Sequence, residues 1–214
     1  MLAYSGCCPT PASRAMPIVE FTALLVLAAA MSFSPGPNTT LAATLAANHG
    51  LRRSLRFVCA VPFGWCLLLL LSASGVGALV LALPALRWAI KAVGIAYLLW
   101  LALRLSQAGQ LAQARSDLLP VRFWQGVGLQ FVNIKAWLLM FTIVAGWIAG
   151  HPDAWQRLAV VLPVMAAFAL ASNLLYACVG ALLRSWLAHG KRLLWFNRLM
   201  ALLLALTAAW MLFA

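Results

Sequence analysis

Long apolar runs separated by short charged connections constrain this chain more than any other feature. Hydrophobic residues make up 65% of its 214 residues, and charged residues make up only 8%. Ordinary soluble domains carry about 25% charged residues, so this composition cannot cover a water-facing surface. The composition therefore predicts an all-α polytopic membrane protein. It excludes a soluble enzyme, a coiled coil, a disordered chain and a secreted disulfide scaffold.

Six apolar segments are expected to cross the bilayer, since one helical crossing takes about 20 residues. They lie near residues 18–47, 54–82, 86–106, 122–149, 157–183 and 193–213. The connection after the third segment divides a single transmembrane domain, 16–214, into halves at 16–107 and 121–214. Because each half has an odd number of spans, the second three-helix half is inverted relative to the first.

The first fifteen residues differ from the rest of the chain. Cys7 and Cys8 are adjacent, proline recurs, and no apolar run is present. We interpret residues 1–15 as an N-terminal extension that is either disordered or the product of a wrongly assigned start, with Met16 as the true start.

The first and fourth segments each contain an interruption. Pro35, Gly36 and Pro37 lie within the first segment, where proline removes a helix hydrogen bond and clashes with the preceding turn. Asn133 and Lys135 lie within the fourth. Broken backbone is not tolerated against lipid, so each interruption should face protein or a water-filled cavity. Interruptions in corresponding segments of inverted halves are the best sequence indication of a transporter's binding site.

Lys135 lies near the middle of the fourth span. It follows Arg122 by about 20 Å of helix, at about 1.5 Å per residue, which is too far for a lysine to reach the interface. An unpaired ammonium there costs at least about 2.5–3.5 kcal/mol. The three acids, Glu20, Asp117 and Asp153, all lie at segment ends or in connections. Lys135 therefore either binds an anionic or zwitterionic ligand or donates to carbonyls freed by the break in the first segment.

Polar residues around the two interruptions form the candidate substrate-binding set. It consists of Pro35, Gly36, Pro37, Asn38, Gln130, Asn133 and Lys135, with Tyr97 and Asn173 as secondary candidates. The half-helix beginning near Asn38 offers free N–H groups and a positive end that suits a carboxylate. In an unbroken helix Asn133 and Lys135 lie about 200° apart, so either the backbone is irregular there or only one of them faces the ligand. For Tyr97 and Asn173, an interhelical hydrogen bond is the simpler role.

The remaining reactive side chains predict no catalytic or metal site. The five cysteines form no C-x-x-C pair, and no group of cysteine, histidine and carboxylate has the spacing of metal ligands. No nucleophile is paired with a base, and no cofactor is expected. The net charge of +12 comes from cations scattered between apolar runs, without the basic stripe that a nucleic acid would require.

The distribution of Lys and Arg predicts the orientation of the chain. One side of the membrane holds Arg52, Arg53, Arg56, Arg104, Arg115, Arg122, Arg184, Lys191, Arg192 and Arg198. The other side holds Arg14, Arg87, Lys91 and Arg157. Cytoplasmic connections carry the positive excess. Both termini are therefore expected on the non-cytoplasmic side.

Several motifs together resemble one known family. Ser34–Asn38, followed by Asn48–Gly50 and a basic connection, is similar to the opening of the LysE/RhtB family of amino-acid exporters. Lys91–Leu98 resembles the third-helix signature of that family, and Phe123–Gly126 with Gln130–Lys135 resembles its fourth-helix motif. The resemblance extends from about residue 16 to the end of the chain.

The resemblance implies a secondary transporter of the bacterial inner membrane, and not an enzyme. It would export amino acids or related small metabolites from the cytoplasm, coupled to the proton gradient. Ile134 stands where most members have proline, and in this it is similar to the cysteine/O-acetylserine exporter branch. Cysteine, O-acetylserine and homoserine-like compounds are the expected substrates. Trp65 stands where some relatives have an acidic residue, which weakens a carboxylate-coupled proton scheme.

Two alternative functions stay open at this level. A membrane thiol–disulfide electron conduit also uses broken first and fourth helices, but it needs a cysteine pair where this chain has Pro-Gly-Pro-Asn and Asn-Ile-Lys. A non-transporting structural subunit would tolerate loss of the Lys135 amine with only a change in stability. The expected partners are the lipid bilayer and a small amino-acid substrate, and the sequence leaves a homo-oligomer open.

Overall fold

A computed structural model describes residues 16–111 and 122–213, and helices account for nearly all of these two ranges. The elements are α1 (Ile18–Phe33), α2 (Pro37–His49), α3 (Leu51–Leu71), a wide π-type turn η1 (Ser72–Val76), α4 (Gly77–Ala82), α5 (Pro84–Leu111), α6 (Phe123–Val132), α7 (Ile134–Ile143), a second wide turn η2 (Val144–Ile148), α8 (Ala154–Leu187) and α9 (Arg192–Phe213). The expected N-terminal extension at 1–15 lies outside the described residues, as do Arg115 and Asp117.

The predicted polytopic all-α fold is confirmed. Within the described ranges, four continuous helical stretches are long and apolar enough to cross a membrane: Leu51–Ala82, Pro84–Ala108, Ala154–Leu187 and Arg192–Phe213. Two bent helix pairs are candidates for the first and fourth spans, which brings the total to six if each pair makes one crossing. The bend is 49° between α1 and α2, and 67° between α6 and the α7–η2 stretch. Both predicted interruptions are therefore present, and α8 extends beyond the predicted 157–183 at each end.

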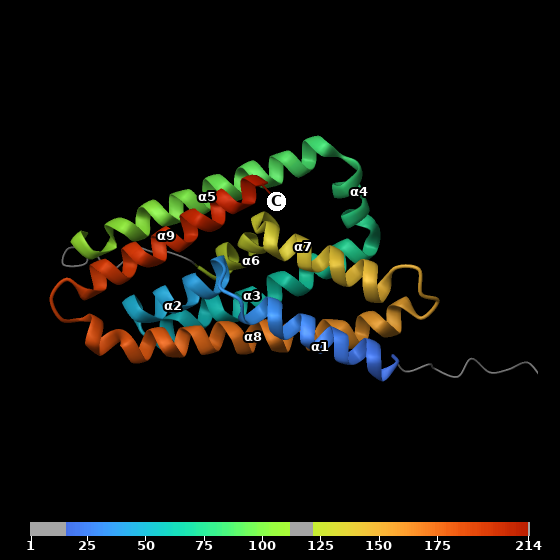
Figure 1. Cartoon of the computed structure of the whole chain (residues 1–214), viewed down its shortest axis with the longest axis horizontal. Helices are drawn as coiled ribbons and strands as arrows, with labels where there is room; N and C mark the ends of the chain where they lie inside the picture. Colours follow the sequence, from blue (N-terminus) through green and yellow to red (C-terminus); the bar gives the residue numbers. More distant parts are fainter. Residues whose placement is uncertain (1–15, 112–121, 214) are drawn as a thin grey trace, which may run out of the picture.

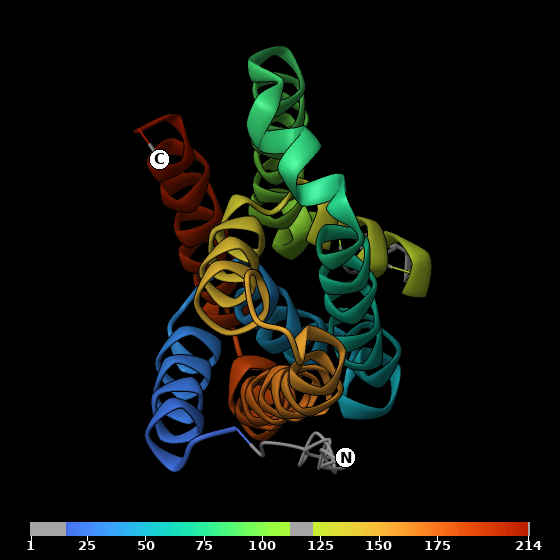
Figure 2. The same cartoon turned by 90° about the vertical axis from the view of Figure 1, so that its right-hand side faces the viewer.

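The two halves run in opposite directions. Figure 1 shows α5 and α9 side by side along the upper edge, with opposite chain directions. Helices α3 and α8 pack against each other in the lower part, also with opposite chain directions. These pairs are the third and sixth spans and the second and fifth spans. Viewed end on, α7 lies near the centre, with α8 and α1 below it and α5 and α9 above it (Figure 2).

Two apolar clusters hold the spans together. One joins α2, α3, α5 and α9 around side chains such as Phe57, Leu101 and Leu204. The other joins α1, α3, α7 and α8 around Leu24 and Met140, among others. Leucines, valines and tryptophans remain exposed on the outer faces of the helices, as a lipid-facing surface requires.

Candidate functional site

The first break separates α1 from α2 at the Pro-Gly-Pro sequence. The chain leaves α1 after Phe33 and re-enters a helix at Pro37, whose missing N–H suits the first helical position. The Thr39 hydroxyl accepts a hydrogen bond from the Gly36 N–H at 3.0 Å and donates to the Gly36 carbonyl at 3.1 Å. The start of α2 is thus held by its own first turn, without a charged side chain.

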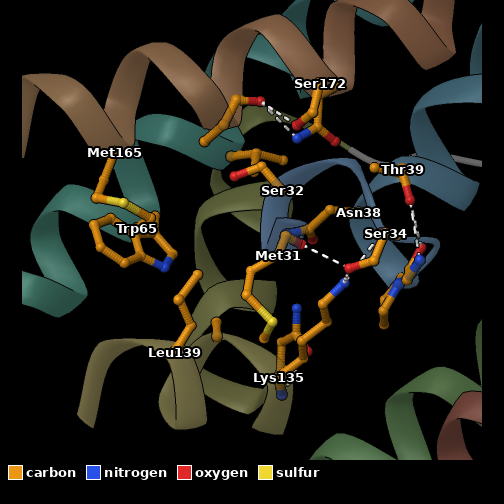
Figure 3. Close-up of a pocket in the computed structure, with 17 residues that line it drawn as sticks. Met31, Ser32, Ser34, Asn38, Thr39, Trp65, Lys135, Leu139, Met165 and Ser172 are labelled. Carbon is orange, nitrogen blue, oxygen red and sulfur yellow. Dashed lines mark hydrogen bonds between the residues drawn. The ribbon is translucent and has the colours of Figure 1, made fainter. Parts of the chain in front are cut away.

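Side chains from other helices satisfy the carbonyls at the end of α1. The Lys135 amine donates to the Ser34 hydroxyl at 2.7 Å and to the Ser34 carbonyl at 3.0 Å, with the Pro35 carbonyl at 3.5 Å (Figure 3). The Tyr176 hydroxyl donates to the Phe33 carbonyl at 3.0 Å. In this conformation Lys135 therefore caps the negative end of α1 and has no carboxylate partner among the described residues.

The second break occurs at Asn133, between α6 and α7. Asn133 leaves helical geometry, and its side-chain oxygen accepts a hydrogen bond from the Lys135 N–H at 3.2 Å, which caps α7. The Trp137 indole bridges the break and donates to the Phe131 carbonyl at 2.8 Å. The backbone is therefore irregular at Asn133, which was one of the two alternatives. Because Asn133 and Lys135 do not lie on one continuous helix, the 200° separation of an ideal helix does not apply to their side chains.

The two breaks are joined by an amide pair. The Asn38 side chain donates to Gln130 at 2.9 Å, and Gln130 donates back to Asn38 at 3.1 Å. Gln130 also donates to the Gly126 carbonyl at 3.1 Å and is fully buried. This reciprocal pair fixes the beginning of α2 against α6.

A cavity of about 60 Å³ lies beside both breaks. One water needs about 10–15 Å³, so the cavity has room for a few waters or a small ligand. Its polar lining includes Ser34, Asn38, Thr39, Asn133, Lys135, Ser172 and Asn173. Its apolar lining includes Met31, Val61, Trp65, Leu139 and Met165. Among the described lining residues, Lys135 alone carries a charge.

The structure brings most of the predicted site residues together. Gly36, Pro37, Asn38, Asn133, Lys135 and Asn173 line the cavity. Pro35 and Gln130 do not line it, but the Pro35 carbonyl accepts from Lys135 and Gln130 is bonded to Asn38. Tyr97 does not line the cavity, because its ring stacks on Trp100 of α5, with the ring centroids 5.8 Å apart.

Several residues that line the cavity were not predicted from the sequence. Ser34 could have been found from its position directly before the proline break. Trp65 was marked by standing where some relatives have an acidic residue, whereas Met165 and Ser172 carry no signal, because apolar and hydroxyl residues are common throughout the spans. Their place in the site follows from how α3 and α8 pack.

The described part of the chain offers no alternative chemistry at the breaks. No group of three or more His, Cys, Asp or Glu side chains in it could hold a metal ion. Cys59, Cys66 and Cys178 are free thiols on α3 and α8, and none of them lines the cavity. No described cysteine therefore lies at the positions where a thiol–disulfide conduit needs its cysteine pair.

Comparison with known proteins identifies the family. The family model described as LysE type translocator matches residues 29–214. A cysteine/O-acetylserine efflux protein of Salmonella choleraesuis is 32% identical over 177 residues, covering 83% of this chain and 89% of that protein. A protein of the same name from Klebsiella pneumoniae is 33% identical over 175 residues, covering 81% of this chain and 89% of that protein. The one from Escherichia coli K12 is 30% identical over 181 residues, covering 83% of this chain and 89% of that protein. No solved structure matches the chain. The chain belongs to the LysE type translocator family and is a multi-pass membrane transporter rather than an enzyme.

Proposed function

We propose that this protein exports small amino acids from the cytoplasm across the bacterial inner membrane, coupled to the proton gradient. Cysteine, O-acetylserine and homoserine-like compounds are the favoured substrates. Support comes from family membership and from relatives named as cysteine/O-acetylserine efflux proteins. The small size of the cavity and its mixed polar and apolar lining suit such compounds.

The observation that carries the proposal is the position of the Lys135 amine. It lies beside a cavity at the break between two half-helices, and it is bonded to the neutral oxygens of Ser34. A substrate carboxylate would form a stronger, charge-assisted bond with this amine than those oxygens do. Lys135 can therefore give up its bonds to Ser34 at the end of α1 and bind the substrate carboxylate instead. Substrate binding is in this way coupled to the position of α1.

In the proposed complex the substrate carboxylate lies between Lys135 and the beginning of α2. The Asn38 and Thr39 N–H groups have no partner inside the helix, because the first carbonyl acceptor, Gly36, bonds the Thr40 N–H. The positive end of the α2 dipole lies at Gly36, next to the Lys135 side chain. Asn38, held by Gln130, and Asn133 support the site. Alternating access would then come from motion of the two broken spans relative to each other.

Export by cells that overexpress the protein tests the proposal. We expect cysteine, O-acetylserine or homoserine to rise in the medium with the wild type, and Lys135→Met to abolish the rise at equal membrane levels. Lys91→Met is the matched control, because Lys91 lies in α5, away from this cavity, and donates to the Leu212 carbonyl at 2.9 Å. We expect this variant to retain export.

Two results would contradict the proposal. Unchanged medium with the wild type would mean that amino acids are not the substrate. Equal export by the wild type and Lys135→Met would remove Lys135 from the transport step. Collapse of the proton gradient in inside-out vesicles should stop uptake, and continued uptake would exclude proton coupling.

A further inference from the structure

Asn173 of α8 carries a buried acceptor without a partner. The residue is only 3% exposed, and its side-chain nitrogen donates to the Ala169 carbonyl at 2.8 Å. Among the described residues its side-chain oxygen, Oδ1, has no hydrogen bond, although Asn173 lines the cavity. A carbonyl only accepts, so the amide nitrogen must face Ala169 and the oxygen must face away from it. A buried acceptor left in this state is costly unless a water or a ligand supplies the donor.

Most other side-chain acceptors of the cavity are already engaged, and the Ser32 and Ser172 hydroxyls that remain are weaker acceptors than an amide oxygen. The Ser34 oxygens accept from Lys135, and the Asn133 oxygen accepts from the Lys135 N–H. The Thr39 hydroxyl is bonded to Gly36 in both directions, and the Asn38 oxygen accepts from Gln130. No carboxylate lines the described cavity. A cationic group in this cavity therefore finds its best free acceptor at Asn173.

We propose that Asn173 Oδ1 binds the α-ammonium group of the transported amino acid. This inference rests on the proposed function, in which the carboxylate of the same substrate lies at Lys135. In Figure 3, Ser172, the neighbour of Asn173 on α8, and Lys135 of α7 lie on opposite sides of the pocket. The carboxylate and the ammonium of the substrate are thus bound from two different spans. The ammonium donates to the amide oxygen of Asn173, and such a bond is charge-assisted.

The remaining wall of the cavity determines which side chain the substrate carries. Met31, Trp65, Leu139 and Met165 are uncharged, and none of them offers a carboxylate to a second ammonium. The cavity therefore favours a short uncharged side chain and disfavours amino acids with a cationic one. Both the α-ammonium and the α-carboxylate of the substrate are required for tight binding.

Competition in wild-type vesicles tests this assignment without any substitution. Inside-out membrane vesicles take up radiolabelled L-cysteine in the presence of a reductant, and unlabelled compounds compete. 3-Mercaptopropionate keeps the thiol and the carboxylate of cysteine but lacks the ammonium. We expect its half-inhibitory concentration to exceed that of L-cysteine by about tenfold or more. Equal competition by the two compounds would overturn the proposal.

A substitution then assigns the effect to Asn173. We expect Asn173→Leu to raise the half-saturating concentration of L-cysteine by about tenfold or more and to leave inhibition by 3-mercaptopropionate unchanged. Cys178→Ala is the matched control, because Cys178 lies on the same helix α8 but does not line the cavity. It should retain wild-type uptake.

The outcomes separate the two proposals. Wild-type vesicles that take up neither cysteine, O-acetylserine nor homoserine would refute the proposed function and the role of Asn173 together. Wild-type uptake combined with unchanged affinity and unchanged discrimination in Asn173→Leu would refute only the role of Asn173. If Asn173→Leu does not reach the membrane, Asn173→Ala is measured in the same way, with the same expected loss of affinity.

Discussion

Individual glycines allow the spans to approach more closely than other residues would permit. A Cβ atom at Gly180 of α8 would lie 2.1 Å from the Ala43 carbonyl oxygen of α2. A Cβ atom at Gly94 of α5 would lie 2.1 Å from the Val132 carbonyl oxygen of α6. Small residues at such crossings let helix backbones pack directly against each other within a membrane. Because α2 and α6 are the half-helices that border the breaks, these two glycines help to position the site.

At the residue scale we predict that Gly180→Ala destabilises the protein. The added methyl group forces α8 away from α2, and overpacking of this kind costs about 1–3 kcal/mol. For a chain of this size we expect the melting temperature in detergent to fall by several degrees. Gly128→Ala is the control, since a Cβ there meets nothing within 4 Å. Equal melting temperatures for the two variants would show that the close approach at Gly180 is not needed.

Residue types predicted where the site lies but not how its members divide their roles. Proline and a mid-membrane lysine both conflict with an ordinary span, so the breaks at Pro35 and Asn133 were readable from the sequence. The bond between Asn38 and Gln130 was not, because it depends on how closely the two breaks approach. Likewise, the separation of Asn133 and Lys135 around an ideal helix did not decide whether the backbone is irregular or only one of the two faces a ligand. Only the backbone shows that Asn133 caps α7 while Lys135 caps α1.

At the scale of elements, the two halves of the first span are held very differently. Helix α2 is buried along most of its length and is tied at both ends by reciprocal amide pairs, Asn38 with Gln130 and Asn48 with Asn197. Helix α1, in contrast, buries mainly Leu24 and Ala28. Helix α2 is thus held along its length by packing, whereas α1 is held mainly by polar contacts at its two ends, from Arg157 at Glu20 and from Lys135 and Tyr176 at the break.

An ion cluster holds the first turn of α1 against α8. The buried Arg157 guanidinium lies 2.5 Å from a carboxylate oxygen of Glu20, and it donates to both oxygens of Asp153 at 3.0 and 3.1 Å. Burial of Asp153 acts to raise its pKa, but the hydrogen bond and the charge of Arg157 outweigh it and lower the pKa below its ordinary value. The spacing of Asp153 and Arg157 was readable from the sequence. The approach of Glu20 was not, because it depends on the packing of α1.

We predict that Glu20→Gln loosens this end of α1. Loss of the charge weakens the bond to Arg157, and the cavity should open more often toward that end. A cysteine at position 32, introduced as Ser32→Cys in a background without the native cysteines, reports on the opening because Ser32 lines the cavity. We expect a membrane-impermeant maleimide to label it several-fold faster in intact cells when Glu20 is replaced.

The exposed Thr22 of α1 provides the control for this experiment. Thr22→Val changes the same helix two residues from Glu20 without touching the ion cluster, so labelling should stay at the rate of the parent. An unchanged rate in Glu20→Gln would show that the cluster does not restrain α1.

At the scale of the whole molecule, hydropathy and the number of spans were sufficient to predict the architecture. Two halves with three spans each must run in opposite directions, and the opposed directions of α5 and α9 agree with this (Figure 1). The kink in the second span was not predicted. There Gly75 adopts a φ of 106°, and α4 turns away from the direction of α3 (Figure 1). A single glycine within an apolar run does not signal such a turn.

The two ends of the bundle differ in charge, and this predicts how the protein is oriented. The connections near Gly50 and Gly190 lie at one end, together with Arg52 and Lys191, and the connection between η2 and α8 lies at the other (Figure 1). Positive connections are retained in the cytoplasm. We therefore propose that the Gly50 and Gly190 connections are cytoplasmic and that α9 ends on the outer side.

Reporter fusions test this orientation. Alkaline phosphatase is active only outside the cytoplasm, whereas green fluorescent protein exported in unfolded form does not fluoresce. A fusion after Ala214 should therefore give phosphatase activity without fluorescence, and fusions truncated at Gly190 should give the reverse. The paired sites control for expression, because they lie on either side of α9 alone. Fluorescence of the fusion after Ala214 would contradict this orientation and would show that the Glu20–Arg157 cluster faces the cytoplasm. The substrate would then enter the cavity from the end of the bundle where this cluster holds α1.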